Sequence, residues 1–218
     1  MVTNTFRWVL RLAAPLLLAV LGTAALSPPP ASAAPGVTDS VDAFLDGLVV
    51  APEGSSSGYS RDQFPHWIDN NGDCQDTRDE VLAWESTVTV RWDSAGCNVT
   101  SGRWWSAYDN QTLTDPADIQ IDHFVPLAEA WRSGASSWTL AQRRSFANDL
   151  SAEETLRAVS GSSNGSKSDH DPDEWLPSNT GFRCQYLIDW VTVKKTWNLT
   201  VEQAEYDALA AGLAPCGV

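Results

Sequence analysis

Basic residues are scarce in this chain. It carries 14 Lys and Arg against 28 Asp and Glu over 218 residues, for a formal net charge of −14 at pH 7. An acidic surface keeps a protein soluble. It also argues against a protein that binds nucleic acid through a broad basic face. Contact with a polyanion would have to depend on a few cations gathered locally and on a bound divalent ion.

Histidine and cysteine are also few, with three and four residues. The histidines form no zinc-binding helix motif, and no two cysteines have the spacing of a zinc knuckle. No Ser or Cys has an identifiable base partner, which disfavours a protease. These counts and spacings therefore disfavour both a zinc site and a nucleophilic Ser or Cys.

Long apolar runs are absent after residue 26. Arg7 and Arg11 flank the start of an apolar stretch over 12–26, and the small-x-small pattern of Ala31–Ala33 follows it. These features predict a signal peptide over 1–33 and a secreted, extracellular protein; the alternative is an N-terminal anchor. No later stretch looks membrane-spanning, so we expect no membrane partner.

Four cysteines in an exported chain predict disulfides. Cys74, Cys97, Cys184 and Cys216 allow three pairings. We favour Cys74–Cys97 and Cys184–Cys216, because each of these pairs closes a local loop within one region of the chain.

The patterns along the chain predict a flexible mature N-terminus over 34–58 with one possible helix, and a single domain over 59–218. Alternating residues predict a short β-hairpin from 87–92 and 99–109, and further short strands over 118–124 and 155–160. Helical patterns cover 76–86, 125–134, 139–150, 184–199 and 200–213. The expected fold class is therefore α+β, and mostly helical.

One stretch, "IQIDHFVPL" over 119–127, places an Asp directly before a His at the end of a predicted strand. A second short strand follows, and then Asn164 on a short helix. Such a strand–strand–helix unit can bring Asp122, His123 and Asn164 around one point. Asp122 and Asn164 supply the hard oxygen ligands that Mg²⁺ or Mn²⁺ prefers. His123 would point to the other side of the strand and act as a general base.

The segments "IDHFVPL" and "LRAVSGSSNGSK" resemble the HNH endonuclease superfamily with its ββα-metal finger. Over Tyr59 to Leu209 the chain is similar to secreted bacterial nucleases of that family. The resemblance implies a divalent-metal-dependent deoxyribonuclease with a ββα-metal finger embedded in the domain. DNA is the expected substrate, with RNA as a further candidate, and a monomer is expected. The acidic charge predicts weak, salt-sensitive binding with little sequence preference.

The resemblance also implies roles for individual residues. His123 matches the general base, Asp122 and Asn164 match the metal ligands, and Lys167 matches a basic residue that contacts phosphate. Arg78 resembles a phosphate clamp; surface ion pairs are its alternative role.

The middle Asn of the family motif is missing. Its position holds Thr155, whose hydroxyl lacks the two-sided geometry of an amide. Asn148 is the candidate that would brace the catalytic loop in its place.

Two alternatives stay open. The spacing of Asp69, Asn71, Asp73 and Glu80 imitates a calcium loop, but Cys74 stands where such a loop needs Gly. The other interpretation of this stretch is an acidic turn tethered by a disulfide. The 11 Trp residues suggest a different function, a non-catalytic extracellular carbohydrate-binding module.

Overall fold

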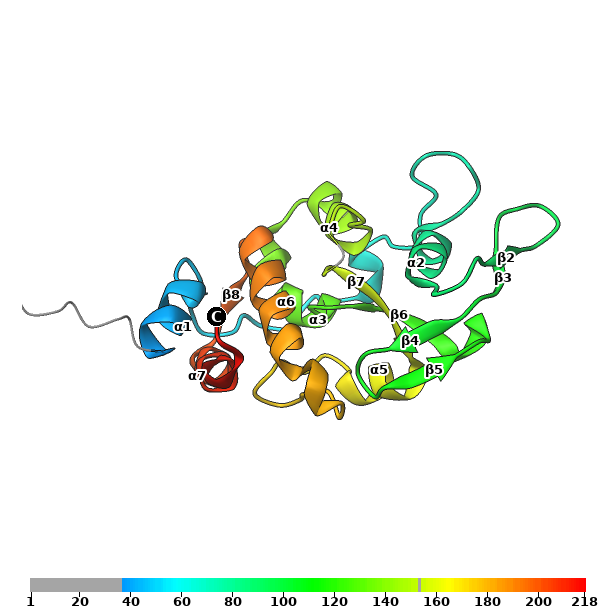
Figure 1. The fold of residues 1–218 in the computed structure, drawn as a ribbon. Coiled ribbons are helices and arrows are strands. Elements are labelled where there is room, and N and C mark those ends of the chain that lie inside the picture. The colour runs from blue at the N-terminus through cyan, green and yellow to red at the C-terminus, as the bar shows by residue number, and fades with distance from the viewer. Residues whose placement is uncertain (1–36, 153) are drawn as a thin grey trace, which may run out of the picture. The chain divides into compact units, whose positions relative to one another are not determined.

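The computed structural model describes residues 37–152 and 154–218 (Figure 1). The predicted signal peptide over 1–33 lies outside these residues. Within them the helices are α1 (Val37–Leu45), α2 (Thr77–Glu85), α3 (Leu127–Arg132), α4 (Leu140–Ala147), α5 (Gly161–Lys167), α6 (Arg183–Thr196) and α7 (Gln203–Leu213). The strands are β1 (Val49–Val50), β2 (Arg91–Trp92), β3 (Val99–Ser101), β4 (Trp104–Ser106), β5 (Gln111–Leu113), β6 (Ile119–His123), β7 (Leu156–Ser160) and β8 (Thr200–Val201). The expected mixture of many helices with short strands is confirmed.

The strands form two-stranded pairs. β1 and β8 are parallel, whereas β2–β3, β4–β5 and β6–β7 are antiparallel. The longest pair is β6–β7, which runs from Ile119 opposite Ser160 to His123 opposite Leu156. Helix α5 begins directly after β7, and the Ser160 side chain caps it by accepting a hydrogen bond from the Ser163 backbone amide.

The single hairpin expected over 87–109 is wrong in detail. The stretch 99–109 divides into β3 and β4, and each pairs with a different strand. The break falls at Gly102, where a Cβ atom would lie 2.6 Å from the ring of Trp104. That ring is fully buried and donates to the Leu82 carbonyl, so the chain must turn away from β2 to bury it.

Strand β6 lies between two apolar clusters. Ile119 and Ile121 belong to the smaller cluster, together with residues of α2, β3, β4 and β7. Phe124 and Val125, which follow the strand, belong to the larger cluster with α6 and α7. Because both flanks of Asp122 and His123 are buried in this way, the two residues have a fixed backbone position.

The segment 34–58, expected to be flexible with one possible helix, contains α1. Val41 and Leu45 of this helix are buried in the larger cluster, and β1 pairs with β8. The described residues form one compact unit, which includes α1 and β1.

Both predicted disulfides are confirmed. Cys74–Cys97 joins the loop before α2 to the turn between β2 and β3, and Cys184–Cys216 joins the first turn of α6 to the end of the chain. Over the described ranges, none of the helices has the length and apolar character that a bilayer span requires.

Candidate active site

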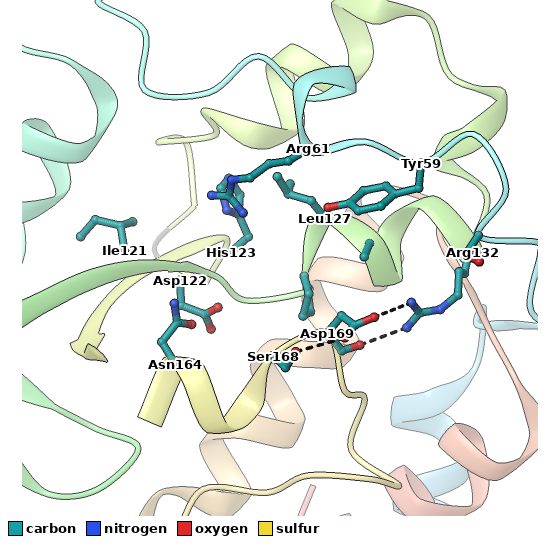
Figure 2. Close-up of a pocket in the computed structure, with 13 residues that line it drawn as sticks. Tyr59, Arg61, Ile121, Asp122, His123, Leu127, Arg132, Asn164, Ser168 and Asp169 are labelled. Atoms are coloured by element: carbon teal, nitrogen blue, oxygen red, sulfur yellow. Dashed lines mark hydrogen bonds and ion pairs between the residues drawn. The ribbon is translucent and has the colours of Figure 1, made fainter. Parts of the chain in front are cut away.

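A cavity of about 460 Å³ gathers three of the predicted site residues. Asp122, His123 and Asn164 all line it (Figure 2). Arg61, Arg132 and Asp169 also line the cavity, so it is polar and holds charges of both signs. The other predicted residues, Asn148, Lys167 and Arg78, do not line it.

His123 is held in one orientation and one tautomer. Its Nε2 lies 3.0 Å from the Ala147 carbonyl oxygen, which only accepts, so Nε2 carries the proton and Nδ1 keeps a lone pair. The ring also stacks on Trp67, with centroids 5.4 Å apart. Burial lowers the pKa of His123 from 6.5 to about 3, so the imidazole is neutral. The ring is therefore neutral and oriented, and Nδ1 is the nitrogen that can accept a proton.

Asp122 points away from His123, on the other side of the strand (Figure 2). Its carboxylate accepts a hydrogen bond from the Tyr108 hydroxyl at 2.6 Å and forms an ion pair with Lys167 at 2.7 Å. Burial raises the pKa of Tyr108 well above its ordinary value, which keeps the phenol protonated and donating.

Lys167 has no exposed side-chain surface, and its ammonium also donates to the His123 carbonyl at 3.2 Å. Burial lowers the pKa of Lys167, although the neighbouring Asp122 opposes this shift. Such a buried, fully engaged cation does not fit a direct contact with a phosphate in the cavity. Its ion pair instead holds the Asp122 side chain against α5, the helix that carries Lys167.

Asn164 on α5 lies beside Asp122 (Figure 2). Its Nδ2 donates to the Gln120 side chain at 2.7 Å, which leaves its Oδ1 as an acceptor. The cavity is therefore lined by a carboxylate and an amide oxygen from two different elements. These are oxygen donors of the type that Mg²⁺ prefers.

Asn148 uses the full hydrogen-bonding capacity of its amide. Its Oδ1 accepts from the Thr77 hydroxyl at 2.8 Å and the Ile68 amide at 3.3 Å, and its Nδ2 donates to the carbonyls of Pro65 and Arg144. It thereby ties the end of α4 to α2 and to the loop over 65–68. That loop carries Trp67, and α4 ends with the carbonyl that orients His123.

Thr155 makes different contacts. Its hydroxyl donates to Asp149, and its carbonyl accepts from the Phe124 amide. Thr155 therefore fixes the backbone at Phe124, just after β6, and makes no hydrogen bond to the ring of His123.

Arg78 lies away from the cavity. Its guanidinium donates to the carbonyls of Pro116 and Ile119, at 2.9 and 3.0 Å. Arg78 therefore anchors the start of β6 through backbone carbonyls, and this contact differs from both the phosphate clamp and the surface ion pairs considered for it.

The acidic loop at Asp69 is a turn that is held by hydrogen bonds from backbone amides to the Asp69 carboxylate. Asp69 accepts hydrogen bonds from the backbone amides of Gly72, Asp73 and Cys74, and these bonds lower its pKa. In the part of the chain that the structure describes, no three His, Cys, Asp or Glu side chains are placed to hold a metal ion. The loop therefore fits the acidic turn tethered by Cys74–Cys97 better than the calcium site.

Several groups around the site were not anticipated from the sequence. The Ala147 carbonyl, Trp67 and Tyr108 contact His123 or Asp122, and Arg61 faces the same cavity. Every residue carries a backbone carbonyl, so the residue type at 147 could not predict this contact. The segment "RDQFPHW" reads locally as a loop of turn formers, so only its packing reveals these neighbours.

Comparison with known proteins gives two matches. Residues 76–211 match the family model described as GmrSD restriction endonucleases, C-terminal domain. A protein of the fungus Arthroderma benhamiae, described as an uncharacterized secreted protein, is 43% identical over 203 residues, covering 91% of this chain and 98% of its own length. No solved structure matches this chain. The similar secreted protein, together with the two disulfides, confirms the predicted secreted localisation. The bacterial origin that the resemblance implied is not shown.

Proposed function

This chain belongs to the family of GmrSD restriction endonuclease C-terminal domains, and from that nuclease relationship we propose that it is a secreted, divalent-metal-dependent endonuclease acting on DNA. The observation that carries the proposal is the unit β6–β7–α5, which puts Asp122, His123 and Asn164 on one cavity. This arrangement is the one expected of an HNH-type ββα-metal finger.

The donor set fits a hard divalent ion. Mg²⁺ in phosphate-processing sites usually has one or two protein oxygen ligands and completes its shell with water and phosphate. Asp122 and Asn164 would supply those two ligands, and the ion pair with Lys167 holds the Asp122 side chain in place. When bound, such an ion neutralises charge on the scissile phosphate and on the leaving oxygen.

His123 is the group that moves the proton. A water oxygen forms a bond to phosphorus while one ester P–O bond breaks. The water proton passes to Nδ1 of His123, and the leaving oxygen takes a proton from solvent. The negative charge of a bound phosphate would favour the imidazolium that forms. It would therefore raise the pKa of His123, which burial lowers.

The proposal is tested by incubating the purified protein with plasmid DNA. We expect nicking and linearisation with Mg²⁺ or Mn²⁺ and none with EDTA, because the phosphate charge is then not neutralised. Restoring the ion after EDTA should restore cleavage. Failure to cleave DNA with any divalent ion would contradict the proposed function, and cleavage in EDTA would contradict its metal dependence. Parallel assays on RNA decide whether the substrate range includes it.

Replacing Asn148 with Ala should lower both stability and cleavage. The variant loses four hydrogen bonds at net values near 1 kcal/mol each, so we expect a loss of roughly 2–4 kcal/mol in the free energy of unfolding. The loosened α4 end would also free the ring of His123. Denaturant unfolding and plasmid cleavage measure the two effects.

Asn70→Ala is the matched control, because Asn70 is exposed and its side chain makes no hydrogen bond in the described structure. Equal stability of the two variants would show that Asn148 does not brace the site.

The alternative of a carbohydrate-binding module is not supported. The family matched is one of nucleases, and several Trp residues serve packing. Trp104 and Trp190 are fully buried, and Trp131 is nearly so.

A further inference from the structure

Most cations near the cavity are already paired. Lys167 is bound to Asp122, and Arg132 forms ion pairs with Glu53, Glu129 and Asp169. Neither has a free charge to offer to a phosphate. A nuclease with a net charge of −14 nevertheless needs a cation at the scissile group.

Arg61 is different. It lines the same cavity as His123 and is exposed. Among the described residues its guanidinium donates one hydrogen bond, to the ring of His66, and no carboxylate forms an ion pair with it. Its charge is one of the causes that lower the pKa of His123, after burial, and Figure 2 shows its guanidinium beside that ring.

His66 fixes the direction of this arginine. Its Nδ1 lies 2.7 Å from the Phe64 carbonyl oxygen, so Nδ1 carries the proton. Its Nε2 therefore has a lone pair and accepts from Nε of Arg61 at 3.2 Å. This bond uses Nε and leaves both terminal nitrogens of the guanidinium unbound. The ring of His66 packs edge-on against Trp67 and His123, which places the pair next to the proposed base.

We propose that Arg61 binds the scissile phosphate and that His66 is the positioning residue that aims it; this rests on the proposed function. The two free nitrogens of a guanidinium match two non-bridging phosphate oxygens. Their positive charge stabilises the negative charge that increases on those oxygens in the transition state. Arg61 and His66 precede the residues 76–211 that the family model matches, so that match assigns them no role.

The first test is kinetic. Arg61→Ala should lower kcat for DNA cleavage about 100-fold, the usual effect of losing one preorganised donor to transition-state charge. Arg61→Lys should recover part of that loss, because it restores charge without the two-pronged geometry. Arg103→Ala is the control for loss of one positive charge, since Arg103 is exposed and lies outside the cavity. Equal activity of Arg61→Ala and Arg103→Ala would overturn the inference while leaving the proposed function intact.

The second test measures binding without cleavage. In a His123→Ala background, a fluorescently labelled DNA duplex is titrated at several salt concentrations in EDTA. Adding Arg61→Ala should reduce the slope of log K against log salt by about one, as expected for one lost phosphate contact. An unchanged slope would overturn the inference. If the wild-type protein neither cleaves nor binds DNA, the proposed function itself fails.

The third test addresses His66. His66→Ala should lower kcat roughly 10-fold, about one-tenth of the effect of losing Arg61, with an unchanged melting temperature. His66→Gln keeps an acceptor for Arg61 and should recover most of the rate. If His66→Gln is as impaired as His66→Ala, or if His66→Ala has no effect when Arg61→Ala does, His66 is not the positioning residue.

Discussion

Replacing His123 with Ala should reduce DNA cleavage by about 10²–10⁴-fold, the usual contribution of a general base. The neutral ring is fixed by the Ala147 carbonyl and by Trp67, and its Nδ1 is the proposed proton acceptor. Cleavage is measured under single-turnover conditions with saturating Mg²⁺. His170→Ala serves as the matched control, because His170 does not line the cavity. Full activity in His123→Ala would exclude this histidine as the base.

The same histidine should make the fold sensitive to acid. Its pKa is about 3 in the folded protein and 6.5 ordinarily. The unfolded chain therefore binds an extra proton between these values, so this histidine lowers stability as pH falls from 6.5 towards 3. His123→Gln removes that group, and its free energy of unfolding should fall less between pH 7 and pH 4.5 than that of the wild type. Parallel decreases in the two proteins would contradict the lowered pKa.

Replacing Lys167 with Met should destabilise the fold by roughly 3–5 kcal/mol, the cost of leaving one partner of a buried ion pair uncompensated. Lys167 is fully buried, and Asp122 is nearly so. If Lys167 instead contacted phosphate, the change would reduce activity with little effect on stability. Denaturant unfolding at constant pH separates these two outcomes. Arg103→Met controls for the loss of a positive charge from an exposed position.

A double variant separates folding from chemistry at the same pair. Asp122→Asn combined with Lys167→Met removes both charges, so most of the lost stability should return. Cleavage should remain low, because the carboxylate proposed to hold the metal is gone. A double variant that is as unstable as the sum of the single ones would show that the pair is not coupled. A double variant that cleaves DNA normally would remove Asp122 from the proposed metal site.

The pair also changes how a single substitution at Asp122 is interpreted. Asp122→Ala would leave the ammonium of Lys167 buried with only a carbonyl as a partner. Its effect on cleavage would then combine lost metal binding with lost folding. The double variant avoids this ambiguity, which arises from a buried ion pair that no sequence pattern predicted.

Local sequence determined much of this protein. The alternation of Ile119 and Ile121 predicts β6, and the helical pattern that begins at Thr139 predicts α4, of which Thr139 is the N-cap. Both disulfides follow from the closeness of their cysteines along the chain. These features depend on neighbours within a few residues, or on short loops, so a pattern read along the chain contains the necessary information.

Tertiary structure alone decided what each side chain near the cavity does. Lys167 reaches Asp122, 45 residues away, and His123 reaches the Ala147 carbonyl, 24 residues away. Arg61 faces the cavity only because its loop packs beside the end of α4, where Asn148 holds it. Whether a lysine meets solvent or a buried carboxylate depends on which segments fold over it. That choice is made by the burial of the whole chain and not by the residues on either side.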